Sequence, residues 1–72
     1  GVAYDIENRK VVRAWDAATG RELARFEPAD EPVDAVRVSR DGGTLAAVGK
    51  SELHVWDLRK NRSILSVAHR LG

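Results

Sequence analysis

Apolar and polar residues alternate in short runs along this chain, and most runs end at Gly, Asp, Asn or Pro. Alternation over about four to eight residues is typical of half-buried β-strands, and these four residue types favour the turns between them. We therefore expect an all-β chain of seven short strands, three before a loop with two prolines and four after it. The expected strands are 2–4, 11–15, 21–26, 33–38, 44–48, 53–56 and 62–67.

One stretch of the pattern occurs twice. Residues 12–16 (Val-Arg-Ala-Trp-Asp) and 53–57 (Leu-His-Val-Trp-Asp) place Trp15 and Trp56 41 positions apart. The same separation relates apolar residues in the segments that follow, so the match extends beyond a chance pair of Trp-Asp dipeptides. The matched pairs are Leu23 with Ile64 and Phe26 with Val67. Each copy predicts a strand, a turn and a second strand, which indicates a repeated β-hairpin unit.

Turn residues follow each copy of the repeat. Asp16 and Asp57 can accept hydrogen bonds from backbone groups further along the turn, and Gly20 can adopt the positive φ that a tight connection requires. Asn61 stands at the place of Gly20 in the second copy, and asparagine tolerates the same left-handed conformation. The strongest hairpin turn is expected at Asp41-Gly42. The predicted structural residues are Trp15, Asp16, Gly20, Asp41, Gly42, Trp56 and Asp57.

Size and composition bound the chemistry of the chain. Its 72 residues include no cysteine, so a small unit must be stabilised without disulfides. His54 and His69 alone cannot build a closed zinc site, and we expect no metal and no cofactor. The 12 basic and 11 acidic residues are interspersed, which argues against nucleic acid as a partner. No apolar run is long enough to span a membrane, and we expect a soluble protein of the cytoplasm rather than a secreted one.

Residues capable of catalysis form no recognisable constellation. His54 should lie on the face of its strand opposite Leu53 and Val55, because side chains alternate along a strand. No Ser-His-Asp arrangement can be drawn from the sequence. Asp16 and Asp57 each precede a turn, where backbone hydrogen bonding accounts for an aspartate without catalysis. We therefore expect no catalytic residue and no enzymatic activity.

Two longer motifs combine these features. The second unit reads Val33-x-x-Val36-x-Val38-Ser39-Arg40-Asp41-Gly42-x-x-Leu45-Ala46, followed by Leu53-x-Val55-Trp56-Asp57. The first unit reads Trp15-Asp16-x-x-Thr19-Gly20-x-x-Leu23-x-x-Phe26. A period of about 40–45 residues with a Trp-Asp ending is the repeat length of WD-repeat β-propellers. The chain resembles this family over nearly its whole length, and the first unit is similar to the end of a preceding blade.

The resemblance implies antiparallel four-stranded propeller blades, one complete and one that lacks a strand. Residues 1–26 would form three strands of the partial blade, 27–32 the proline-containing acidic loop between blades, 33–67 the complete blade, and 68–72 a tail. Family blades often join a Gly-His pair, a Ser or Thr, an Asp and the tryptophan in a buried network. Here the loop has no histidine, Ala47 stands where the hydroxyl is expected, and Lys50-Ser51 lacks the aspartate. Trp56 is therefore expected to pack without its usual partners.

Blades of a propeller pack face to face in a closed ring, which two blades do not complete. Apolar side chains on their outer faces would be left in water, although burying each one contributes about 1.5–3 kcal/mol. We expect the chain either to be part of a longer propeller or to self-assemble into a ring. The third alternative is that the seven strands close on themselves as a small sandwich or barrel.

The resemblance further implies a protein–protein interaction scaffold that binds its partner through loops on one rim. The residues matched to that rim are Arg9, Asp30, Glu31, Lys50, Ser51 and His69. Two other functions stay open: a non-catalytic segment of a propeller enzyme, and an independent seven-stranded module that binds polyanions through basic turns. Those turns would be Arg9-Lys10-x-x-Arg13 and Arg59-Lys60-x-Arg62.

Overall fold

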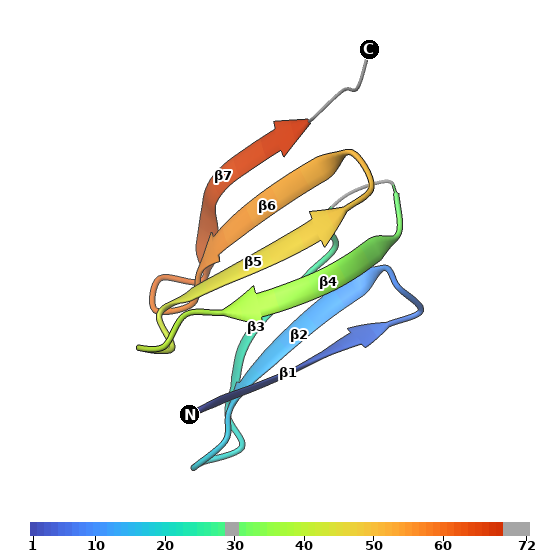
Figure 1. Ribbon diagram of the computed structural model, residues 1–72. Coiled ribbons are helices and arrows are strands. Elements are labelled where there is room, and N and C mark those ends of the chain that lie inside the picture. Colours follow the sequence, from blue (N-terminus) through green and yellow to red (C-terminus); the bar gives the residue numbers. More distant parts are fainter. Residues whose placement is uncertain (29–30, 69–72) are drawn as a thin grey trace.

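The computed structural model describes residues 1–28 and 31–68. The described residues form seven antiparallel strands in two sheets and contain no helix, which confirms the predicted all-β class (Figure 1). The three-stranded sheet consists of β1 (Val2–Glu7), β2 (Val11–Asp16) and β3 (Glu22–Phe26). The four-stranded sheet consists of β4 (Val33–Val38), β5 (Thr44–Gly49), β6 (Glu52–Asp57) and β7 (Arg62–Ala68).

Both sheets are meanders, in which each strand pairs with the next one along the chain. The pairing of β1, β2 and β3 repeats that of β5, β6 and β7, so the three-stranded sheet has no counterpart of β4 among the described residues. Figure 1 shows the two sheets stacked, with β1 and β7 on opposite sides of the molecule. The stack is elongated, with extents of 44 × 23 × 17 Å. The strands therefore do not close into a barrel.

Strand register aligns the two sheets residue by residue. Val12 of β2 lies opposite Ile6 of β1, and Leu53 of β6 lies opposite Val48 of β5. The register shifts immediately before Trp15 in β2 and immediately before Trp56 in β6, so both sheets carry a bulge at the same step. Bulges re-aim the side chains around them. The repeat seen in the sequence is thus a repeat in three dimensions as well.

β1 is longer than the expected strand 2–4. Residues 5–7 lie beyond that expected strand, but Asp5 and Glu7 continue it opposite Arg13 and Val11. The Arg13 guanidinium makes two hydrogen bonds to the Asp5 carboxylate, Nε to Oδ1 at 3.0 Å and Nη2 to Oδ2 at 2.6 Å. Oppositely charged residues on adjacent strands stabilise pairing, which explains a strand in a polar stretch.

The hydrophobic core lies between the two sheets and draws on both of them. The Trp56 ring stacks on the Phe26 ring across this interface, with centroids 4.1 Å apart and planes within 3°. A backbone hydrogen bond from Val33 N to Arg9 O, 2.7 Å long, also links the sheets. The fully buried apolar residues are Val12, Ala14, Ala24, Val33, Val36, Leu45, Ala47 and Leu58, and Val2, Ile6, Phe26, Val38 and Trp56 pack against them.

Five turn residues have positive φ, and three of them were singled out in the sequence. Gly20 has φ 77° and Asn61, at the equivalent place, has φ 52°, which confirms the expected left-handed conformation of Asn61. Gly42 has φ 74°, and a Cβ there would meet Cγ2 of Val2 at 3.1 Å. The turn at Gly42 therefore also needs a small residue to bring the two sheets together.

Candidate functional site

Four of the six residues matched to the rim lie at one end of the molecule. Arg9 is in the β1–β2 turn, Glu31 is in the connection to β4, and Lys50 and Ser51 form the β5–β6 turn. Asp30 and His69 lie outside the described residues. Arg9 and Lys50 are exposed, whereas Glu31 and Ser51 are half-buried. The rim thus presents cations to solvent and holds a carboxylate inside.

Glu31 fixes the shape of the β5–β6 turn. Its Oε1 accepts a hydrogen bond from Ser51 N at 2.9 Å, and its Oε2 accepts one from Ser51 Oγ at 2.8 Å. A Cβ added at Gly49 would stand 2.5 Å from Glu31 Oε1 and 3.0 Å from Pro32 O, so glycine is the residue that admits this approach. Glu31 and Ser51 therefore hold the β5–β6 turn in place. The Glu31 carboxylate is already engaged in hydrogen bonds within the chain.

Arg9 holds the two sheets together at the same end. It has φ 56°, its carbonyl accepts the hydrogen bond from Val33 N, and its guanidinium pairs with the carboxylate of Asp34. Basic and acidic clusters that are far apart in the sequence thus meet here. Since both side chains are half exposed or more, the pair contributes little to stability but sets the local charge pattern.

At the opposite end, aspartates organise the turns. Asp16 Oδ1 accepts a hydrogen bond from Ala18 N, and Asp57 Oδ1 accepts bonds from Arg59 N and Lys60 N at 2.9 and 3.0 Å. Asp41 accepts bonds from Ser39 Oγ at 2.6 Å and Gly43 N at 2.9 Å, and these bonds lower the pKa of its carboxyl group. These carboxylates act on the backbone of their own turns.

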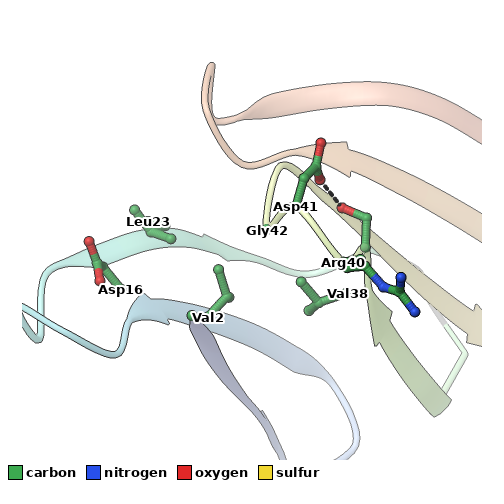
Figure 2. Close-up of a pocket in the computed structure, with 9 residues that line it drawn as sticks. Val2, Asp16, Leu23, Val38, Arg40, Asp41 and Gly42 are labelled. Atoms are coloured by element: carbon green, nitrogen blue, oxygen red, sulfur yellow. Dashed lines mark hydrogen bonds between the residues drawn. The ribbon is translucent and has the colours of Figure 1, made fainter.

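An open hollow lies between the sheets at this second end. Figure 2 shows Val2 and Leu23 of the three-stranded sheet on one side and Val38, Asp41 and Gly42 of the four-stranded sheet on the other. The Arg40 side chain lies at its edge. The hollow is shallow and open to solvent, and its lining offers one aspartate pair from separate turns rather than a converging set of catalytic groups. It marks where the sheets separate.

Three polar side chains form a hydrogen-bonded row that the sequence did not reveal. Ser66 Oγ lies 2.8 Å from His54 Nδ1, and His54 Nε2 lies 3.0 Å from Glu52 Oε2. No Ser-His-Asp arrangement was expected, and this Ser-His-Glu row depends on the pairing of His54 with Ser66, which only the register of β6 and β7 sets. The row ties the edge strand β7 to β6.

The two tryptophans have different surroundings. Trp56 stacks on Phe26 between the sheets and donates a hydrogen bond from Nε1 to Asn61 Oδ1 at 3.1 Å. It therefore does have a polar partner, supplied by its own turn. Trp15 lies on the outer face of the three-stranded sheet, with the Arg13 guanidinium carbon 5.1 Å from its ring centroid. The bidentate bond to Asp5 raises the pKa of Arg13, so the cation over the ring is permanent.

The described residues offer no metal site: no group of three or more His, Cys, Asp or Glu side chains within residues 1–28 and 31–68 is placed to hold an ion. Nor does that part of the chain contain a helix that could cross a membrane.

Sequence comparisons find relatives that are named pre-mRNA-processing factors. The chain is 36% identical over 58 residues to Pre-mRNA-processing factor 19 of Oryza sativa subsp. japonica. It is 32% identical over 59 residues to Pre-mRNA-processing factor 19 homolog 2 of Arabidopsis thaliana. The matches cover 81% and 82% of this chain, but the chain spans only 11% of the length of each relative. No family model matches the chain.

Pre-mRNA-processing factor 19 is a WD-repeat protein. The structure adds two antiparallel sheets that repeat the same strand pairing, the same bulge and the same Trp-Asp step. The resemblance of the chain to the WD-repeat β-propeller family is thereby confirmed.

Proposed function

We propose that the chain is a two-blade segment of a protein–protein interaction scaffold, without catalytic chemistry of its own. Residues 33–67 form the complete blade, residues 1–26 three strands of the preceding blade, 27–32 the loop between them and 68–72 a tail. The observation that carries the proposal is the stacking of Trp56 on Phe26, because it packs one repeat onto the next through repeated positions. Stacked repeats of this kind serve as rigid surfaces on which loops bind partners.

The partner-binding surface in this proposal is the rim that contains the β1–β2 and β5–β6 turns. Lys50 projects charge from it, Arg9 pairs with Asp34 beside it, and Glu31 and Ser51 keep the β5–β6 turn in shape. Asp30 and His69 belong to the same proposed surface. A turn of fixed shape that exposes Lys50 suits an acidic or carbonyl-rich loop of a protein partner.

Binding of polyanions is less well supported by the geometry. Arg9 pairs with Asp34, and Arg13 pairs with Asp5 and lies 3.8 Å from Glu7. The first basic cluster is therefore largely neutralised by carboxylates of the same chain, which removes the basic stripe that phosphate backbones require.

Charge reversal at the rim tests the proposal. Affinity-tagged Lys50→Glu chain is compared with tagged wild type by quantitative mass spectrometry of the proteins that co-purify. The control is Lys60→Glu, an equally exposed lysine in the β6–β7 turn at the other end of the molecule. We expect Lys50→Glu to lose a set of proteins that Lys60→Glu retains, while circular dichroism of both stays like wild type. If the same proteins co-purify with all three chains, the proposed partner-binding surface is contradicted.

A further inference from the structure

A second, smaller cleft adjoins the hollow of Figure 2 and shares Leu23 and Gly42 with it. It lies between the start of β3 in one sheet and the β6–β7 turn of the other, and its volume is about 270 Å³. Both sheets therefore contribute to it. We call it the arginine cleft, and besides Gly42 its lining residues are Arg21, Glu22, Leu23, Leu58, Arg59 and Asn61.

The arginine cleft receives one arginine from each sheet. The Arg59 guanidinium lies against the β4–β5 turn, with Nη2 3.4 Å from Asp41 O and 3.6 Å from Asp41 Oδ2. A Cβ at Gly43 would stand 2.6 Å from Arg59 Nη1, so glycine admits the guanidinium there. Arg21 is exposed and has no carboxylate partner in the described part of the chain. Both guanidinium groups therefore keep N–H donors available for a ligand.

Asn61 adds a third donor to the arginine cleft. Trp56 Nε1, which can only donate, forms its 3.1 Å hydrogen bond to Asn61 Oδ1. This bond engages the amide oxygen of Asn61 and leaves the Nδ2 hydrogens as donors. The Trp56 ring is itself held by stacking on Phe26. The packing of the two sheets therefore fixes the place of this donor.

Carboxylates around the arginine cleft are engaged with other groups. Glu22, the one acidic residue among its lining residues, accepts a hydrogen bond at Oε1 from Arg25 Nε at 3.1 Å. Asp57 accepts hydrogen bonds from the backbone of its own turn. Lys60 and Arg62 beside the cleft are exposed, and neither forms an ion pair with another described residue. The cleft therefore attracts anions.

We propose that the arginine cleft binds the phosphate group of a phosphorylated serine or threonine of a protein partner. Such a phosphate carries a charge of about −1.5 to −2 at pH 7, which matches two guanidinium groups better than a carboxylate does. Leu23 and the buried Leu58 supply apolar walls for the carbon atoms of the side chain. The described lining offers no aromatic ring on which a nucleobase could stack, which favours a peptide over a nucleotide. This site is separate from the proposed rim, which lies at the other end of the molecule.

Titration of the chain with short capped peptides, followed by nuclear magnetic resonance, tests the proposal. The probe is a phosphoserine flanked by glycines, and the matched probes carry serine or glutamate in its place. The Trp56 indole N–H reports on the cleft through its bond to Asn61, and the Trp15 indole N–H, on the outer face of the other sheet, is the internal reference. We expect the phosphoserine peptide to shift the Trp56 signal saturably and to leave the Trp15 signal in place. The glutamate peptide should bind about tenfold more weakly, and the serine peptide should cause no shift.

Variants then assign the binding to the cleft. Arg59→Gln and Arg21→Gln should each weaken binding of the phosphoserine peptide about tenfold, with circular dichroism like that of wild type. Arg62→Gln is the matched control, because it removes an exposed arginine that does not line the cleft, and it should change the affinity by less than about twofold. The inference is overturned if the phosphoserine peptide causes no saturable shift, or if Arg62→Gln weakens binding as much as Arg59→Gln does. Glutamate peptide or inorganic phosphate that binds as tightly as the phosphoserine peptide would also overturn it. All of these results are independent of the rim test with Lys50→Glu.

Discussion

The two sheets of this protein carry the same pattern of residues and differ in what lies against it. At equivalent points, Val12 and Ala14 are fully buried, whereas Leu53 and Val55 are partly open to solvent. Neither their strand register nor their hydrophobicity distinguishes the two sets. The difference comes from the neighbouring sheet, which covers the first set and not the second. Burial in a repeat fold is therefore a property of the stack rather than of the single repeat.

Replacing Trp56 or Trp15 by alanine should give the largest difference in the free energy of unfolding. Trp56→Ala deletes the ring that fills the interface and should cost about 3–5 kcal/mol. Trp15→Ala removes a half-buried outer ring under Arg13 and should cost about 1 kcal/mol. Urea unfolding followed by circular dichroism measures both. Equal losses would show that the sheets are not packed through Trp56.

Enlarging Ala14 or its counterpart Val55 should give the next largest difference in stability. Ala14→Leu forces three extra carbons into a filled interface and should destabilise the chain by about 1–3 kcal/mol. Val55→Leu, at the equivalent point of the four-stranded sheet, should change stability by no more than about 0.5 kcal/mol. Thermal unfolding of both variants is the measurement. An unchanged melting temperature for Ala14→Leu would mean that the interface between the two sheets is not closely packed.

The Ser66–His54–Glu52 row distinguishes β7 from its counterpart β3. Ser66→Ala removes the hydroxyl that bonds to His54 Nδ1 and should cost about 0.5–1.5 kcal/mol, concentrated in the edge strand. Hydrogen exchange measured by mass spectrometry should show faster exchange in β7 and unchanged exchange in β3. Ser63→Ala, on the same strand, is the matched control. Unchanged exchange in Ser66→Ala would mean that the row does not hold the strand.

The turn between β4 and β5 should give the smallest effect, and one that depends on pH. Hydrogen bonds from Ser39 Oγ and Gly43 N lower the pKa of Asp41 from its ordinary 3.8 in the folded chain. Its contribution to stability is thus present above pH 3.8 and is lost as pH falls through the lowered pKa. The difference in melting temperature between wild type and Asp41→Asn should therefore shrink on acidification. A difference that grows in acid would contradict the assigned cause.

The sequence predicted the elements better than the surfaces between them. Alternation, the 41-residue repeat and the turn residues located all seven strands, because these signals are local. The strand at Asp5–Glu7 was missed, since its support is an ion pair with Arg13 in another strand. The Ser66–His54 contact was missed because it depends on the register of two strands, which a bulge shifts. Pairing of Arg9 with Asp34 required the sheets to be stacked first.

The most direct test of the stacked arrangement is a nuclear Overhauser spectrum of the chain, whose 72 residues are few enough for complete assignment. Phe26 is the only phenylalanine and the tryptophans are two, so the ring signals are readily separated. The account predicts strong cross-peaks between the Phe26 ring and the Trp56 indole, and none between Phe26 and Trp15. Cross-peaks from Phe26 to Trp15, or none to Trp56, would contradict it.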